Sequence, residues 1–213
     1  MTSLRSSLAL PLMSALLAAG TFGPPAHGHE AKTPVIVDTD MALDDVRALA
    51  LLASDDHVSL EAAIATGGAS SVGAGAGNLA WVLDRLGQES VPVATGRSSG
   101  GDPPAWREVS ETLGFTLTEP RPAPADVLED PAAAVSAAAG GSEGDAVYLC
   151  LGPATTLAAL LDTDPSLAEQ IGSVYFLGDP PSPRSGAWNT KRDPEALSRV
   201  RDAGVRIHFV WLA

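Results

Sequence analysis

The chain is short of basic residues, aromatic residues and cysteine. Thirteen Lys and Arg stand against 26 Asp and Glu in 213 residues, which gives a net charge of −13. This balance argues against a nucleic-acid backbone or an anionic membrane surface as the partner. The single cysteine, Cys150, excludes an intrachain disulfide, and its apolar neighbours are typical of a buried, inert thiol. With 45% apolar residues and no internal repeat, the chain is typical of one globular domain.

The N-terminus carries an apolar stretch that is too short to span a membrane. Residues 6–20 (SSLALPLMSALLAAG) follow one basic residue, and a spanning helix needs about 20 apolar residues. Ala26 and Gly28 then occupy the −3 and −1 positions of a small-residue cleavage site. We therefore expect residues 1–28 to be a signal peptide, and residues 29–213 to form the exported domain, periplasmic or secreted. No cysteine lies near the cleavage point, so neither a lipid anchor nor later membrane attachment is expected.

Short β-rich apolar runs alternate with helical patterns along the rest of the chain. This alternation predicts an α/β fold with an open, mostly parallel sheet covered by helices on both faces. The segment 96–124 and the segment 179–192 have no clear period and are predicted as loops, the first with room for one helical turn. Expected strands are 33–40, 58–66, 91–95, 146–151, 173–178 and 205–212, and expected helices are 44–54, 73–86, 125–139, 154–162 and 193–204.

Four aspartates fall within eight positions of VIVDTDMALDD, residues 35–45. Asp38 and Asp40 end the first predicted strand, and Asp44 and Asp45 open the following helix. Ligands of such sheets bind at the carboxyl ends of strands. One aspartate suffices to cap a helix, so capping does not account for four. A cluster of carboxylates suits a hard cation such as Ca²⁺ or Mg²⁺, and we expect a metal site here.

The same residues resemble a known family, the inosine–uridine-preferring nucleoside hydrolases. DTDMALDD is similar to that family's DTDxxxDD signature, and LCLGPATTLAALL (149–161) to its strand–GPLTNLA–helix segment. AWNTKRDPEAL (187–197) resembles its EFNxxxDPEAA, VYFLGD (174–179) its strand ending in Met-Gly-Gly, and VPVATG (91–96) its VPVxxG. The resemblance runs in order over residues 34–212 and implies a nucleoside-hydrolase-like, Rossmann-like fold.

The resemblance also implies a role for individual residues. Asp40 and Asp45 match Ca²⁺-ligating carboxylates, and the backbone carbonyl of Leu151 matches a main-chain ligand. Asp38 matches an aspartate that supports the metal site from behind. In the family Ca²⁺ grips the 2′- and 3′-hydroxyls of the ribose and a water, and Asp40 matches the base that takes the proton of that water.

Two further positions complete what the resemblance implies. Asp44 and Asn189 match residues that hold the ribose hydroxyls. The implied activity is Ca²⁺-dependent hydrolysis of the N-glycosidic bond of ribonucleosides, which releases ribose and the free base. The implied partner is therefore a small nucleoside or ribose, and a homo-oligomer stays open.

Several positions depart from the family pattern. The Glu of EFN is replaced by Ala187, the Asn of GPLTN by Thr156, and Met-Gly-Gly by Leu177-Gly178-Asp179. Ala69 or Ser70 stands where members usually have an Asn. The family's last third supplies a further metal-binding Asp and, in many members, the His that protonates the leaving base. It has no counterpart up to Ala213, so we expect poor hydrolysis of inosine and better cleavage of an activated riboside.

Two other classes stay open. The first is a homologue that binds metal and ribose but has weak or no turnover, which the departures favour. The second is a haloacid-dehalogenase-like phosphatase, in which Asp38 would be the nucleophile and Mg²⁺ the clamp. That second class leaves the downstream matches without explanation.

Overall fold

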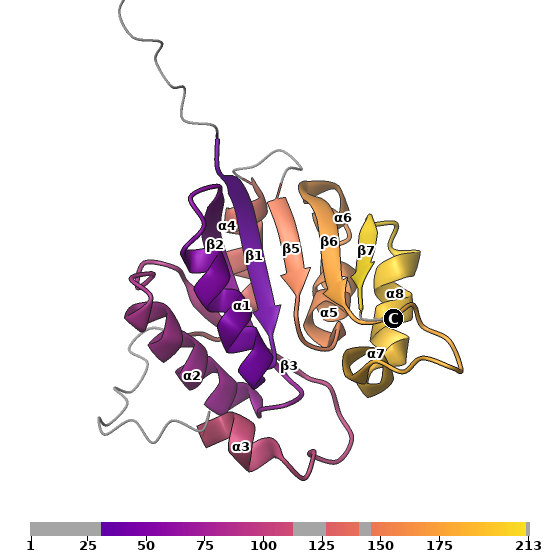
Figure 1. Cartoon of the computed structure of the whole chain (residues 1–213). Coiled ribbons are helices and arrows are strands. Elements are labelled where there is room, and N and C mark those ends of the chain that lie inside the picture. The colour runs from indigo at the N-terminus through magenta and orange to yellow at the C-terminus, as the bar shows by residue number, and fades with distance from the viewer. Residues whose placement is uncertain (1–30, 113–126, 141–145, 212–213) are drawn as a thin grey trace, which may run out of the picture. The chain divides into compact units, whose positions relative to one another are not determined.

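The strands of the protein form one parallel sheet. The computed structural model describes residues 31–112, 127–140 and 146–211. Seven strands lie in the order β4-β3-β2-β1-β5-β6-β7, and every neighbouring pair is parallel (Figure 1). Their bounds are β1 Thr33–Thr39, β2 Val58–Gly67, β3 Val93–Ser98, β4 Val127–Leu128, β5 Ala146–Cys150, β6 Ile171–Leu177 and β7 Ile207–Val210.

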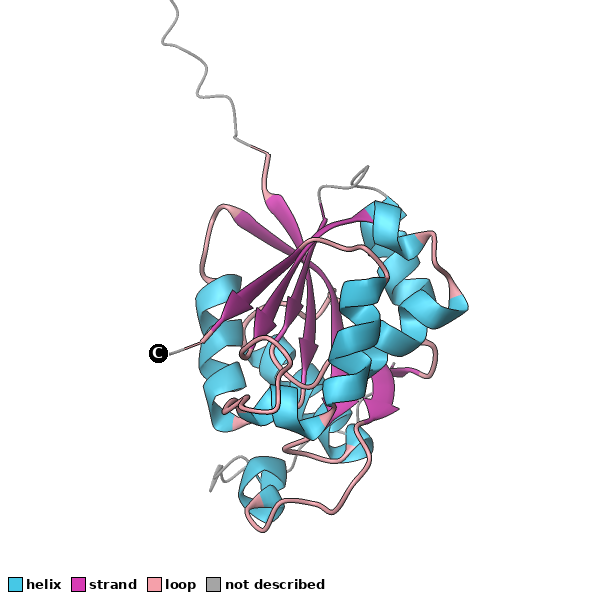
Figure 2. Cartoon of the chain, turned by 90° about the vertical axis from the view of Figure 1, so that its right-hand side faces the viewer, coloured by secondary structure: helices cyan, strands magenta, loops and turns pink. Residues whose placement is uncertain are grey.

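Helices connect the strands, because parallel neighbours require a crossover from the end of one strand to the start of the next. The helices are α1 Leu43–Ala53, α2 Val72–Arg85, α3 Arg107–Thr112, α4 Pro131–Gly140, α5 Thr155–Thr163, α6 Leu167–Gln170, α7 Trp188–Arg192 and α8 Pro194–Asp202. Figure 2 shows helices on both sides of the sheet. The expected α/β class with a parallel sheet between helices is confirmed.

Two apolar clusters, one on each face of the sheet, make up the core. Alternate residues of β1 supply both: Ile36 belongs to the cluster beneath α4, α5 and α8, and Val37 to the cluster beneath α1 and α2. Both side chains have no exposed surface. Burial on both faces explains why β1 reads as a continuous apolar run instead of an alternating one.

The two faces are covered to different extents. In Figure 1, α1 lies in front of β1 and β2, whereas no helix of the described part lies in front of β6 and β7. On that open part of the face, Tyr175 of β6 is 37% exposed and Val210 of β7 is 49% exposed. Tyr175 stacks on His208, with ring centroids 4.6 Å apart.

Most predicted elements are present, with differences at short elements. Residues 188–192 form α7 where a loop was predicted, and α6 was not predicted at all. The helix expected from residue 125 begins only at Pro131, after the two-residue strand β4. Pro131 thus stands at the first helical position, where its missing N–H costs nothing. No helix in the described ranges is long and apolar enough to cross a bilayer. The predicted signal peptide lies outside the described residues.

Candidate functional site

The four aspartates lie where the strand order changes direction. β1 has β2 on one side and β5 on the other, because the chain first builds β2 and β3 outward and later returns with β5. In open parallel sheets the crevice at such a point is the usual ligand site. Asp38 and Asp40 stand at the carboxyl end of β1, and Leu151 directly follows β5.

Backbone hydrogen bonds hold the ends of β1 and β5 together. The amide of Leu151 donates to the carbonyl of Asp38 at 2.7 Å. A Cβ atom added to Gly152 would lie 2.9 Å from the backbone nitrogen of Asp40, so a larger residue would push the two turns apart. Glycine in this Gly-Pro turn therefore allows the carbonyl end of β5 to approach Asp40 closely.

A strained turn brings Asp45 back toward Asp40. Met41 is fully buried and has a φ of 57°, a left-handed conformation that is uncommon for a non-glycine residue. Its amide donates to Thr39 Oγ1 at 2.9 Å, and Thr39 Oγ1 donates to Asp45 Oδ2 at 2.7 Å. The turn thus reverses the chain between β1 and α1, with Asp45 in the first turn of the helix.

Asp40 and Asp45 form a buried pair of carboxyl groups. Each is 2% exposed, and the two carboxyl groups interact electrostatically. The backbone amide of Ala69, in the loop after β2, donates to Asp40 Oδ2 at 2.8 Å. Burial raises the pKa of both carboxyls, and the neighbouring charge of Asp40 raises that of Asp45 further. Two adjacent buried carboxylates are costly unless a proton or a cation neutralises them.

Asp38 lies behind this pair and has its own partners. It is fully buried, its Oδ2 accepts from the Tyr148 hydroxyl at 2.8 Å, and its Oδ1 accepts from the Thr66 hydroxyl. Burial raises the pKa of Asp38 to about 7, against the lowering effect of these two hydrogen bonds. Thr66 in turn contacts the hydroxyl of Thr156 on α5. Asp38 is therefore placed to support β1 and not to meet a ligand directly.

A pocket of about 440 Å³ opens at the carboxyl end of β6 and β7, and Asp44 lines it, whereas Asp40 and Asp45 do not. Its volume falls within the usual range for a site that holds a small organic molecule. Asp44 is exposed there, and Trp188 is 40% exposed and lies near enough to Asp40 to oppose in part the rise that burial gives to the pKa of that carboxyl. The pocket is lined by Asp44, Leu177, Gly178, Asp179, Gly186, Ala187, Trp188, Val210 and Trp211.

Asn189 links the ends of β5 and β6. It is 7% exposed on α7, and its Nδ2 donates to the carbonyls of Leu151 at 2.6 Å and Leu177 at 2.9 Å. The carbonyl that matches a main-chain metal ligand thus already accepts one hydrogen bond. Because a carbonyl oxygen has two lone pairs, it can accept a second partner.

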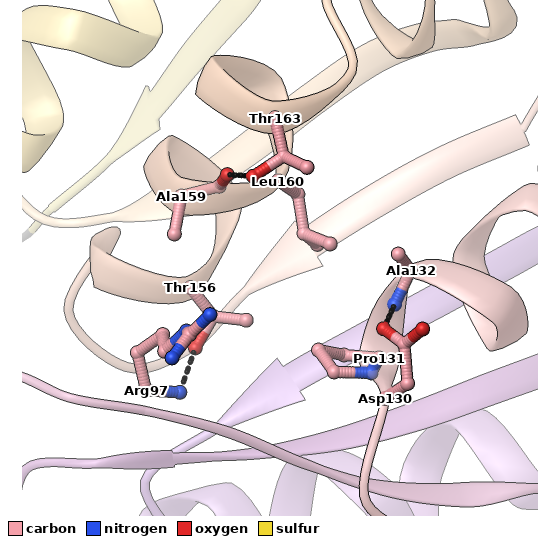
Figure 3. A pocket seen from close by; sticks show the side chains of 8 residues that line it. All are labelled: Arg97, Asp130, Pro131, Ala132, Thr156, Ala159, Leu160 and Thr163. Carbon is pink, nitrogen blue, oxygen red and sulfur yellow. Dashed lines mark hydrogen bonds between the residues drawn. The ribbon is translucent and has the colours of Figure 1, made fainter.

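A second, smaller pocket lies beside α5, where β3 ends and α4 begins (Figure 3). It holds about 90 Å³, which is too small for a nucleoside-sized molecule. In this pocket the amide of Arg97 donates to Thr156 Oγ1 at 2.9 Å. Thr156 contacts Thr66, which binds Asp38, so the pocket borders the hydroxyl groups behind Asp38. This pocket is not the candidate substrate site.

The donor set at the aspartate pair fits a metal ion only in part. Within the described ranges, no group of three or more His, Cys, Asp or Glu side chains is arranged to hold one. Asp38 points its carboxylate at Tyr148 and Thr66, so the three aspartates 38, 40 and 45 are not one triad. The remaining set is two carboxylates beside the turn that carries the Leu151 carbonyl. It is all oxygen and therefore suits a hard cation, with water or substrate as the other ligands.

Some residues of the site could not be found by sequence reasoning. Tyr148 reaches Asp38 from 110 positions away, and the amide of Ala69 has no side-chain signature at all. Thr39 had a signal, since it stands between Asp38 and Asp40 in the motif and donates to Asp45. Partners from other strands, such as Tyr148, can be identified only once the order and register of the strands are known.

The chain is similar in sequence to known nucleoside hydrolases. The profile of the inosine-uridine preferring nucleoside hydrolases matches residues 35–213. A probable uridine nucleosidase 2 of Oryza sativa subsp. japonica is 30% identical over 189 residues, covering 84% of this chain and 56% of the relative. A pyrimidine-specific ribonucleoside hydrolase RihA of Photobacterium profundum is 29% identical, covering 84% and 60%. The chain thus spans little more than half the length of these relatives.

Solved structures share the fold. An inosine-guanosine nucleoside hydrolase superposes with a TM-score of 0.69 at 23% identity, covering 84% of this chain and 59% of that one. A plant nucleoside hydrolase superposes with a TM-score of 0.67 at 22% identity, also covering 84% and 59%. At such identities the likeness establishes the fold and leaves the chemistry to the residues of the site.

Proposed function

The chain belongs to the inosine-uridine preferring nucleoside hydrolase family, and from this premise we propose that it is a nucleosidase. The reaction is hydrolysis of the N-glycosidic bond of a ribonucleoside, which yields ribose and the free base. The observation that carries the proposal is the buried Asp40–Asp45 pair at the change of strand order, next in the chain to Asp44, which lines a pocket of about 440 Å³. The relatives from Oryza and Photobacterium support the same reaction type.

Each site residue has a proposed task. Asp40 takes the proton from the water that attacks the anomeric carbon, because its carboxylate is held in place by the amide of Ala69. Asp44 and Asn189 hold ribose hydroxyls, and Asp38 keeps β1 in place from behind. Positive charge develops on the sugar as the base departs, and the nearby carboxylates stabilise it electrostatically.

Calcium is the proposed cofactor. Asp40, Asp45 and the carbonyl of Leu151 would hold it, and when bound it would lower the pKa of the attacking water and fix the sugar hydroxyls. The all-oxygen donor set and the raised pKa values of both carboxyls support a hard cation at this place. Bound calcium would also neutralise this pair of buried carboxylates, which is costly in free energy without a counter-charge.

A ribose-binding protein without turnover is the second candidate. Ala187 and Ala69 favour it, because both stand where the family pattern has polar side chains. The phosphatase alternative is disfavoured, because its nucleophile would be Asp38, whose carboxylate is fully buried and occupied by two hydroxyls.

An assay of released reducing sugar separates the two main candidates. The purified chain, with millimolar Ca²⁺, is given uridine, inosine and p-nitrophenyl riboside, and the same samples are repeated with a chelator. Calcium-dependent release of ribose from any of them supports the nucleosidase. Binding of ribose by calorimetry, with no release from the activated riboside, supports the binding protein instead.

We further propose that the protein is exported and begins near His29 after cleavage at Gly28. The N-terminal residue of the mature protein, measured by mass spectrometry of the fractionated host, checks this. A chain that still begins at Met1 in the cytosol would contradict it. The nucleoside or ribose remains the only partner proposed, and light scattering determines whether copies of the chain associate.

A further inference from the structure

The loop after β2, residues 68–71, hydrogen-bonds Asp40 only through backbone amides within the described part of the chain. The amide of Ala69 donates to Asp40 Oδ2 at 2.8 Å, and the amide of Ser70 donates to the backbone carbonyl of Asp40 at 3.0 Å. Ala69 has no polar side chain, and Ser70 Oγ has no hydrogen-bond partner among the residues that the structure describes. The direction of the Gly68–Ala69 peptide therefore decides whether the Asp40 carboxylate keeps its donor.

Glycine at position 68 brings this peptide against the carboxylate. A Cβ atom added to Gly68 would overlap Asp40 Oδ2, the same oxygen that accepts from the Ala69 amide. A residue without a side chain is the one that allows the backbone to approach so closely. The loop thus places a peptide group directly on the side chain of Asp40.

Arg107, the first residue of α3, holds the other end of the same peptide group. Its Nη2 donates to the carbonyl of Gly68 at 3.1 Å. This carbonyl and the Ala69 amide belong to one peptide bond, and in a planar trans peptide the C=O and the N–H point in opposite directions. A donor that holds the carbonyl therefore also directs the N–H toward Asp40.

The charge of Arg107 adds to this geometric effect. A cation that donates to a carbonyl polarises the peptide and strengthens the hydrogen bond that its N–H gives. Arg107 Nε is buried, so water screens this side of the guanidinium less than it screens an exposed charge. Two hydrogen bonds and one peptide group thus connect a cation to the carboxylate of Asp40.

We propose that Arg107 is a positioning residue for Asp40 and acts through the Gly68–Ala69 peptide. The inference rests on the proposed function, in which Asp40 is the base that takes the proton of the attacking water. Because Oδ2 is held by the Ala69 amide, the Oδ1 of the same carboxylate keeps a constant direction for taking that proton.

A role in fastening α3 alone would have different consequences. Glu111 of the same helix also binds this loop, because its Oε1 accepts from the amide of Ser71 at 2.9 Å. Glu111 thus fastens the loop at Ser71, whereas Arg107 holds the peptide that faces Asp40. If Arg107 only fastened the loop, Arg107→Ala and Glu111→Ala would have the same effect on the catalytic carboxylate.

The amide proton of Ala69 tests the contact directly. Nuclear magnetic resonance of the folded chain without substrate measures its chemical shift, which moves upfield when a hydrogen bond to a carboxylate weakens. We expect an upfield shift in Arg107→Ala and a much smaller one in Glu111→Ala. Arg199→Ala, which removes an exposed arginine of α8 paired with Asp162, is the matched control and should leave the signal unchanged. An Ala69 signal that is the same in Arg107→Ala and in wild type would overturn the proposal.

Kinetics separate positioning from fastening. At saturating Ca²⁺, Arg107→Ala should lower kcat on p-nitrophenyl riboside about tenfold and leave KM nearly unchanged, as for a lost interaction that acts in the transition state. Arg107→Lys keeps a cationic donor for the Gly68 carbonyl and should retain most of the rate and of the Ala69 shift. If Arg107→Ala does not fold, Arg107→Gln, which lacks the charge, takes its place in both measurements. Equal losses of kcat in the Arg107 variant and in Glu111→Ala would refute the proposal.

The two measurements distinguish failure of the inference from failure of the proposed function. A chain that hydrolyses nothing, but whose Ala69 signal moves in Arg107→Ala and returns in Arg107→Lys, would sustain the inference while the proposed function fails. Hydrolysis by wild type that Arg107→Ala leaves unchanged would sustain the function and refute the inference.

Discussion

The α1 side of the sheet has a covered half and an open half. Over β1 and β2 this face is buried: Val37 has no exposed surface and Ala63 is 2% exposed beneath α1 and α2. Over β6 and β7 the same face leaves Tyr175 and Val210 exposed by 37% and 49%. The opposite face is covered along its length by α4, α5 and α8. The two halves thus differ by one layer of helices.

The covered half holds the carboxylates, whereas the open half carries the pocket. The carboxylate pair lies at the end of the covered half, where packing on both faces fixes the strands and excludes water. The pocket lies at the end of the open half, because Leu177 and Val210 line it from β6 and β7. The pocket thus lies at the open half, whereas packing in the covered half holds the carboxylates in place. Substitutions in the two halves should have different consequences, which range from lost catalysis to small losses of stability.

Asp40→Asn should abolish nearly all hydrolysis. The substitution keeps the size of the side chain but removes the base that accepts the proton of the attacking water. A positioned general base typically contributes about 10²–10⁴-fold, and kcat on p-nitrophenyl riboside should fall by that factor. Asp56→Asn, in the exposed turn before β2, is the control and should retain wild-type activity. Retained activity in Asp40→Asn would assign the base to another residue.

Leu49→Ala should cost far more stability than Tyr175→Ala. Leu49 is fully buried on α1, so its truncation leaves a cavity and should lower the free energy of unfolding by about 2–5 kcal/mol. Tyr175 lies on the open half and chiefly loses its stack on His208, so about 0.5–1 kcal/mol is expected. Urea unfolding of both variants gives the comparison. Similar losses would mean that another polypeptide covers the open half in solution.

Calcium should raise the stability of the folded chain. A ligand that binds only the folded state stabilises it by about 2.7 kcal/mol at a concentration 100-fold above its dissociation constant. Thermal melting after chelation, with and without millimolar Ca²⁺, measures the effect. Asp45→Ala should remove the response and Asp56→Ala should keep it. A melting temperature that calcium leaves unchanged would count against the metal site.

Asn189→Ala should lower stability modestly. Its amide joins the Leu151 carbonyl on the covered half to the Leu177 carbonyl on the open half. Losing both hydrogen bonds should lower the free energy of unfolding by about 1–2 kcal/mol and weaken Ca²⁺ binding, because the Leu151 carbonyl is no longer held. Ser198→Ala, on the exposed side of α8, serves as the control in urea unfolding and calcium titration.

The sequence predicted the long helices and strands and missed short ones such as α6 and α7. β1, α1, β2 and α2 were predicted within about two residues at each end, because each has a clear apolar period and ends at polar or glycine residues. α7 has only five residues, and its sequence, WNTKR, has no helical period of its own. It forms because Asn189 and Thr190 are anchored to carbonyls at the ends of the neighbouring strands.

The sequence by itself determined the parallel α/β class, the place of the aspartates at the end of β1, and the resemblance that named the family. These follow from local periodicity and from a contiguous motif, which need no knowledge of contacts. Only the tertiary structure decided that Asp38 faces Tyr148 while the charges of Asp40 and Asp45 act on one another, and that Asp179 and Ala187 line one pocket. Those juxtapositions depend on strand order and register, which join residues far apart in the chain.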